Sequence, residues 1–161
     1  MKIQIRRGAF ETNSSSTHSI VIPKKVDYTL NHVNFYVGEY GWFESCADPA
    51  SYLYTAILEL EKYEYRQGLL DKLKLILDKN GITYEFRYPR EREYYYVDHV
   101  EDLTGFVDKC LNDEDYLIRF LSAGDVYTGN DNNMYEEENP DRLLAYNQSD
   151  PDNYDYYYKS N

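Results

Sequence analysis

The chain contains 161 residues, of which 29 are acidic and 17 basic, so its formal net charge is −12. Such a charge repels a phosphate backbone, because nucleic-acid affinity depends on cations that displace counterions, and direct binding of nucleic acid is therefore not expected. The length predicts one domain with its own core, and no segment is apolar and long enough to span a bilayer, so we expect a cytoplasmic protein with no membrane partner.

The N-terminal stretch that ends at Pro23 predicts two strands around a polar loop. Residues 2–6 alternate in polarity, and residues 18–22 are rich in β-branched side chains and end at Pro23. Between them lies the run Phe10–Ser19, in which seven side chains carry a hydroxyl or an amide. The two strands are expected to form a hairpin around this loop or to lie side by side in one sheet.

The middle of the chain predicts a strand followed by a long helical region. Residues 33–37 have the composition of a strand. Asp48 followed by Pro49 is typical of a helix start, with aspartate as the N-cap and proline at the first helical position. Gly68 is expected to break or bend the helix, and Asn80-Gly81 to cap its end.

Two short strands are expected after the helical region. Residues 82–88 alternate in polarity and end at Pro89, and residues 94–97 follow a charged turn at 90–93. This spacing predicts a β-hairpin.

The last third of the chain predicts two helices, or one bent helix, at 101–111 and 113–121. A short strand at 125–128 and a turn at 129–133 follow. Helices and strands do not alternate regularly, so we predict an α+β fold, with a mostly antiparallel sheet and two to four helices packed on one face.

The expected domain organisation is a single α+β domain over residues 1–146 and an acidic, tyrosine-rich tail over residues 147–161. The sequence leaves two alternatives for the last dozen residues: they are disordered, or they dock on the sheet as an edge strand.

Acidic residues are concentrated near the C-terminus. Residues 131–161 hold eight acids and two bases, a net charge of −6, and the chain has 20 tyrosines against six phenylalanines. Tyrosine offers a flat ring and a hydroxyl, which suits protein binding, and acids with rings between them imitate a nucleic acid. The predicted partner-binding residues are Glu136, Glu137, Glu138, Asp152, Tyr154, Asp155, Tyr156 and Tyr157. The plainer interpretation is that the acids confer solubility and that tyrosine replaces phenylalanine in the core.

The segment Arg7–Ser19, with the run Phe-Glu-Thr-Asn-Ser-Ser-Ser-Thr-His-Ser, resembles the start of small uncharacterised bacteriophage and prophage proteins of Gram-positive hosts. The match covers roughly the first 22 residues of the chain. It implies a phage setting and brings no known reaction, so no catalytic residue is assigned from it.

Charge, tyrosine content and this resemblance favour a binding protein over an enzyme. The expected function is inhibition of a host defence protein by occlusion of its basic, nucleic-acid-binding surface, as an anti-CRISPR protein does. The expected partner is thus a host protein, in the cytoplasm of the bacterium.

An alternative function assigns the polar loop to a small phosphorylated ligand such as a nucleotide, which it binds or hydrolyses. The candidate residues are Arg7, Glu11, Asn13, Ser14, Ser15, Ser16, Thr17 and His18. For hydrolysis, Ser16 or Thr17 is the possible nucleophile, His18 the base and Glu11 the group that orients it. The structural interpretation is that the hydroxyls and amides only bond to the nearby backbone and fix a wide turn.

No metal or cofactor is expected. Cys46 and Cys110 lie far apart and suit buried thiols in a reducing compartment. The three histidines, His18, His32 and His99, lie in separate segments without the spacing of a zinc site.

Overall fold

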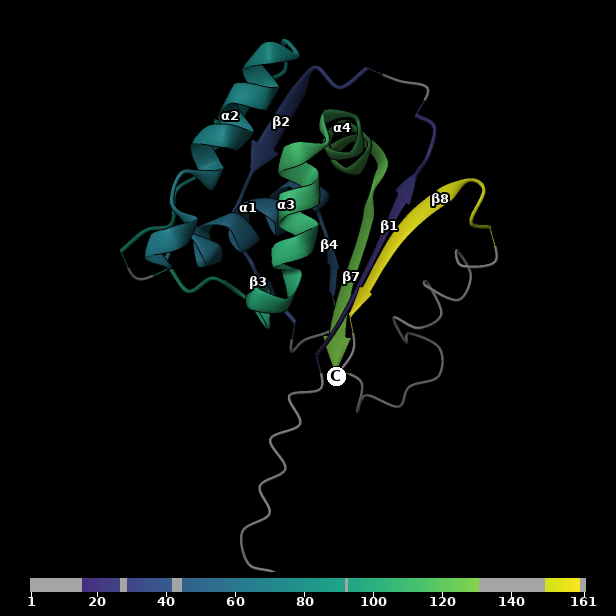
Figure 1. The fold of residues 1–161 in the computed structure, drawn as a ribbon. Coiled ribbons are helices and arrows are strands. Elements are labelled where there is room, and N and C mark those ends of the chain that lie inside the picture. Colours follow the sequence, from purple (N-terminus) through teal and green to yellow (C-terminus); the bar gives the residue numbers. More distant parts are fainter. Residues whose placement is uncertain (1–15, 27–28, 42–44, 92, 131–149, 160–161) are drawn as a thin grey trace, which may run out of the picture.

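The computed structural model describes residues 16–26, 29–41, 45–91, 93–130 and 150–159 (Figure 1). In chain order the elements are β1 (Ser16–Pro23), β2 (His32–Phe35), β3 (Glu39–Tyr40), β4 (Ser45–Ala47), α1 (Pro49–Leu60), the 3-10 turn η1 (Glu64–Arg66), α2 (Leu69–Lys79), β5 (Thr83–Phe86), β6 (Tyr96–Val97), the 3-10 turn η2 (Val100–Leu103), α3 (Thr104–Asn112), α4 (Glu114–Ala123), β7 (Asp125–Asn130) and β8 (Tyr154–Lys159). The protein has an α+β fold, as predicted.

The main sheet has the strand order β4-β7-β1-β8, and all its neighbours are antiparallel. Ile20 of β1 lies opposite Val126 of β7 and Tyr157 of β8. The four helices lie to one side of this sheet (Figure 1). Two further pairs of strands, β2 with β5 and β3 with β6, form separate two-stranded sheets and are parallel. The largest sheet is thus antiparallel, and the two small sheets are parallel.

Helix α1 lies at the centre of the core. Every residue from Ala50 to Ile57 is buried, so this helix is enclosed by its neighbours on all sides. Helix α2 is different, because only Leu70, Leu73, Ile76 and Leu77 are buried, Leu69 and Lys74 are half-buried, and its other residues are exposed. In the sheet, Ile20 and Ile22 have no exposed surface and belong to the same core.

The helix boundaries follow the predicted local signals. Asp48 caps α1, because its side chain accepts a hydrogen bond of 3.0 Å from the amide of Ser51, and Pro49 is the first helical residue. Helix α1 ends at Leu60, before the predicted break, and Gly68, with a φ of 89°, separates η1 from α2. After α2, Gly81 adopts a left-handed φ of 67°, which glycine tolerates without strain.

The predicted hairpin at 82–88 and 94–97 is wrong. Strand β5 pairs in parallel with β2, and β6 pairs in parallel with β3. The charged turn does form, since the amide of Arg90 donates to Glu93, but the chain then diverges to a different partner. Parallel strands need a long crossover connection, and the segment that contains helices α1 and α2 provides it here. Strands β5 and β6 therefore pair with β2 and β3, which are distant in sequence, and not with each other.

Other predictions near the C-terminal half have mixed outcomes. Residues 104–123 form two helices, α3 and α4, rather than one bent helix, and residues 101–103 belong to η2. Gly129 and Asn130 extend β7 instead of opening a turn, because both pair with the start of β1. Residues 154–159 form the edge strand β8, one of the two structures considered for this segment. The predicted strand at 2–6 and the domain boundary after Tyr146 fall outside the described residues.

Of the helices in the described ranges, none has the length and the apolar character needed to cross a bilayer.

Replacing Asp48 with alanine is expected to lower the free energy of unfolding by about 1 kcal/mol, because the first turn of the central helix loses its cap. Urea denaturation measures this change. The matched control is Asp71→Ala, which removes an exposed carboxylate of α2 and should leave stability almost unchanged. Equal effects of the two substitutions would contradict the capping role.

Candidate functional site

Strand β8 carries most of the described candidate residues from the C-terminal segment. It pairs with β1 so that Asp155 lies opposite Ile22 and Tyr157 opposite Ile20. Alternate residues of a strand face opposite sides, and both partners on β1 are buried in the core. Asp155 and Tyr157 therefore face the helices, and Tyr156, which is 37% exposed, faces the other side of the sheet.

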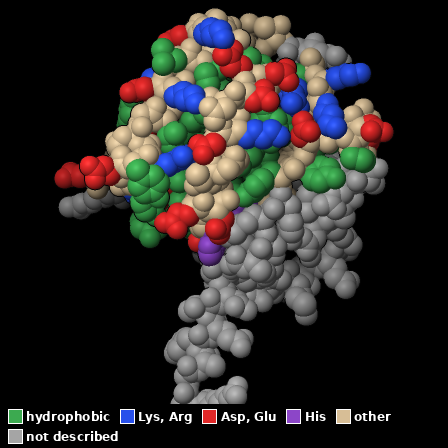
Figure 2. Space-filling view, viewed as in Figure 1, with side chains coloured by type: hydrophobic (Ala, Val, Ile, Leu, Met, Phe, Trp, Pro, Cys, Tyr) green, Lys and Arg blue, Asp and Glu red, His purple; other side chains and the backbone are tan. Residues whose placement is uncertain are grey.

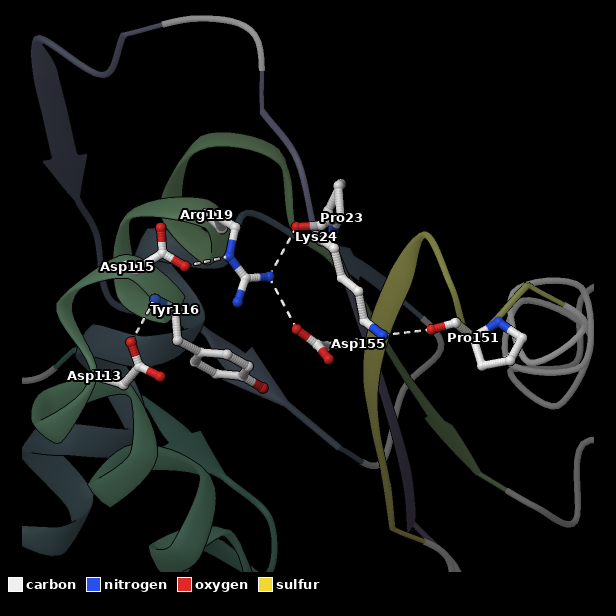
Figure 3. A network of polar contacts seen from close by, with 8 residues as sticks. All are labelled: Pro23, Lys24, Asp113, Asp115, Tyr116, Arg119, Pro151 and Asp155. Carbon is white, nitrogen blue, oxygen red and sulfur yellow. Dashed lines mark hydrogen bonds and ion pairs between the residues drawn. The ribbon is translucent and has the colours of Figure 1, made fainter.

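The carboxylate of Asp155 is engaged within the fold (Figure 3). One guanidinium nitrogen of Arg119 lies 3.0 Å from Asp155 Oδ2 and donates across 2.9 Å to the carbonyl oxygen of Pro23. The Nε of the same side chain donates to Asp115, one turn earlier in α4, at 2.9 Å. Arg119 thus ties α4, the end of β1 and β8 together.

Tyr157 is also part of the fold. Its hydroxyl donates a hydrogen bond of 2.9 Å to the carbonyl oxygen of Asp102, and its ring lies 5.5 Å from that of Phe106. Burial, with a smaller effect of the Asp102 charge, raises the pKa of its phenol above the ordinary value. The phenol therefore remains a neutral donor, and the side chain anchors β8 to η2 and α3.

The remaining candidates of this segment are divided by position. Asp152 is exposed and Tyr154 is half-buried. Asp155 and Tyr157 are held by Arg119 and Asp102. The other described candidates of this segment are Asp152, Tyr154 and Tyr156, whose side chains take no part in those two contacts. Glu136, Glu137 and Glu138 lie outside the described residues. Contact with a partner remains a prediction for all of them.

Replacing Arg119 with glutamine is expected to lower the free energy of unfolding by about 1–2 kcal/mol, because Asp155 and Pro23 lose a charged hydrogen-bond donor. Amide hydrogen exchange should accelerate in β8. Lys79→Gln is the control, since its ion pair with Glu114 is exposed and contributes little. Unchanged exchange in β8 would show that Arg119 does not hold this strand.

The polar loop is described only at its end. Arg7, Glu11, Asn13, Ser14 and Ser15 lie outside the described residues.

Ser16 and Thr17 begin β1, and their backbones lie opposite Asn130 and Gly129 of β7. His18 follows with its side chain fully buried, and its Nδ1 lies 2.9 Å from the hydroxyl of Tyr52 on α1.

The His18–Tyr52 pair joins the sheet to the central helix. Neither side chain has exposed surface, and the residue opposite His18 on β7, Thr128, is also buried. Burial is the main cause that raises the pKa of the Tyr52 phenol well above its ordinary value. A neutral phenol and an imidazole enclosed in this way position β1 against α1. A role of the loop in ligand binding stays a prediction.

Replacing Tyr52 with phenylalanine is expected to destabilise the protein by about 1–3 kcal/mol, because a buried nitrogen of His18 loses its partner. Thermal unfolding followed by circular dichroism measures the loss. Tyr88→Phe, at a tyrosine with 57% of its surface exposed, is the control and should change little. If the Tyr52→Phe variant unfolds at the same temperature as the original chain, the structural role of the pair is contradicted.

No metal or thiol site is found in the described part of the chain. It contains no group of three or more histidine, cysteine, aspartate or glutamate side chains arranged to hold a metal ion. Cys110 is buried in α3, and burial raises the pKa of its thiol, so it is not a reactive thiolate. The side chain of Cys46 is not described.

Comparisons with known proteins give no relative: no protein-family model matches the chain, and neither the curated proteins nor the solved structures contain a match.

Sequence reasoning missed the residues that give the candidates their roles. Arg119 and Tyr52 both lie far along the chain from the residues that they bond, Asp155 and His18 respectively. One local signal was available for Arg119, because Asp115 lies one helical turn before it on the same face of α4.

Proposed function

We propose that this protein binds a basic partner, and that it acts as a phage-type inhibitor of a host defence protein by occluding the surface with which that protein holds nucleic acid. The proposed setting is the cytoplasm of the bacterial host. The protein contributes shape and charge to this function and carries out no reaction.

The excess of unpaired acid on the described surface carries this proposal. Basic and acidic side chains are interspersed on the face seen in Figure 2, and six basic residues form ion pairs with carboxylates. These pairs neutralise much of the positive charge. Exposed acids without an ion pair among the described residues include Glu39, Glu64, Glu85, Glu91, Asp125 and Asp152.

The physical consequence is long-range attraction of a basic surface. A net charge of −12 steers a cationic protein toward this one and excludes nucleic acid from the same encounter. Exposed tyrosines add contact area that loses little entropy on binding. Both properties support a protein that competes with nucleic acid for the same partner.

The function is tested by capture and competition. The protein is immobilised and exposed to a Gram-positive host lysate at about 50 and about 500 mM salt, values that lie well apart on the scale of Debye screening. We expect it to retain a nucleic-acid-binding protein at low salt only. The purified partner should then lose its labelled DNA or RNA, followed by fluorescence anisotropy, when this protein is added.

A charge-neutralised variant is the control for that experiment. Conversion of these six unpaired acids to their amides should weaken the competition at least about tenfold, since each exposed charge contributes a few tenths of a kcal/mol or more. A partner that stays bound to nucleic acid in the complex would contradict occlusion. Recovery of a small phosphorylated molecule without a protein partner would support the ligand-binding alternative instead.

A further inference from the structure

A hollow lined by tyrosine and carboxylate lies between η1, β6 and η2, away from the C-terminal strand in sequence. Its volume is about 290 Å³, and its lining includes Tyr63, Tyr96, Asp98 and Glu101. His99 also lines it, with a ring nitrogen 3.7 Å from the carboxylate of Asp98. None of the described residues that line it is a lysine or an arginine. We call it the tyrosine–carboxylate hollow.

Two pairs of tyrosines flank the hollow. Tyr63 packs against Tyr65 with 5.8 Å between ring centroids, and Tyr96 packs against Tyr94 at 5.9 Å. The inner member of each pair lines the hollow, whereas Tyr65 and Tyr94 are 81% and 76% exposed. Large rings held this far out of the core indicate an interaction surface.

The carboxylates are placed against these rings. The hydroxyl of Tyr63 donates to Glu101, which fixes the direction of that carboxylate. Glu39 lies opposite Tyr96 in the β3–β6 pair, and burial together with the charges of Glu39 and Asp98 raises the pKa of the Tyr96 phenol. The hollow therefore combines neutral phenols with negative charge.

The chain itself shows how this kind of surface holds a cation. The ammonium of Lys62 lies 4.9 Å from the ring centroid of Tyr95 and forms an ion pair with Glu59. Lys62 directly precedes Tyr63, and Tyr95 lies between Tyr94 and Tyr96. A ring and a carboxylate thus hold one cation of the chain itself, on residues adjacent in sequence to two tyrosines that line the hollow.

We propose that the tyrosine–carboxylate hollow binds an arginine side chain of a basic protein partner. A guanidinium is planar, so it stacks on a tyrosine ring while it donates two parallel hydrogen bonds to a carboxylate. Lysine offers only a compact charge and is expected to bind less tightly. This inference rests on the proposed function, because it names the group of the basic partner that this protein engages.

The test uses an octa-arginine peptide as the probe, with binding measured by isothermal titration calorimetry at about 50 mM salt, where screening is weak. The double variant Tyr65→Ala/Tyr94→Ala should bind about tenfold more weakly than the original chain, because the two exposed rings that pack on the lining residues Tyr63 and Tyr96 are lost as stacking surfaces for a guanidinium. The matched control is Tyr36→Ala/Tyr88→Ala, which removes two other exposed tyrosines, 47% and 57% exposed, and should leave binding unchanged.

Three further measurements separate ring stacking from general charge. The variant Tyr65→Phe/Tyr94→Phe keeps the rings and should retain the affinity of the original chain. Glu101→Gln should weaken binding more than Glu85→Gln, which removes an exposed charge of β5. Octa-lysine should bind several-fold more weakly than octa-arginine.

The outcomes distinguish this inference from the proposed function. If octa-arginine binds the original chain, both alanine double variants and Glu101→Gln equally, the hollow is not the site, although attraction to a basic partner stands. If octa-arginine fails to bind the original chain at low salt, both the hollow and the proposed function are overturned.

Discussion

The structure depends on strand β1, because this strand is paired along both edges and buried on both faces. Strand β7 lies on one edge and β8 on the other, and Ile20, Val21 and Ile22 are at most 2% exposed. The hydrogen bonds of β1 are therefore protected from water by neighbours on every side. His18 and Arg119 extend this arrangement to helices α1 and α4, so the position of the helices follows from the position of the strand.

The elements that local sequence determines were predictable. Asp48-Pro49 marks the start of α1, and a glycine with positive φ follows α2, because caps depend on residues within one turn. Pairing between strands was not predictable in the same way. Residues 82–97 have the composition of a hairpin, but their partners, β2 and β3, precede α1 in the chain. Hydrophobic alternation identifies a strand and leaves its neighbour undetermined.

The candidate site shows the same division between composition and placement. Composition draws attention to acids and tyrosines, but it assigns them equal roles along residues 150–159. In the fold, Asp155 meets Arg119 and Tyr157 meets Asp102, whereas Tyr156 faces away from the helices. Tyr63 and Tyr96 fall in segments that were predicted as helix and strand respectively. Their arrangement around one hollow depends on contacts between segments that helix α2 and strand β5 separate in the chain, which a pattern along the sequence does not contain.

The pairing of β8 with β1 has a consequence for how the protein is made. Ile20 and Tyr157 are direct neighbours in the sheet, yet one lies near the start of the chain and the other near its end. During synthesis, β1 leaves the ribosome long before β8 exists, so its open edge persists while the helices form. Closing so long a segment is entropically costly and slow. Strand β8 can therefore join the sheet only after the other described strands have been synthesised, and until then one edge of the apolar strand β1 lacks its partner and is open to pairing with another chain.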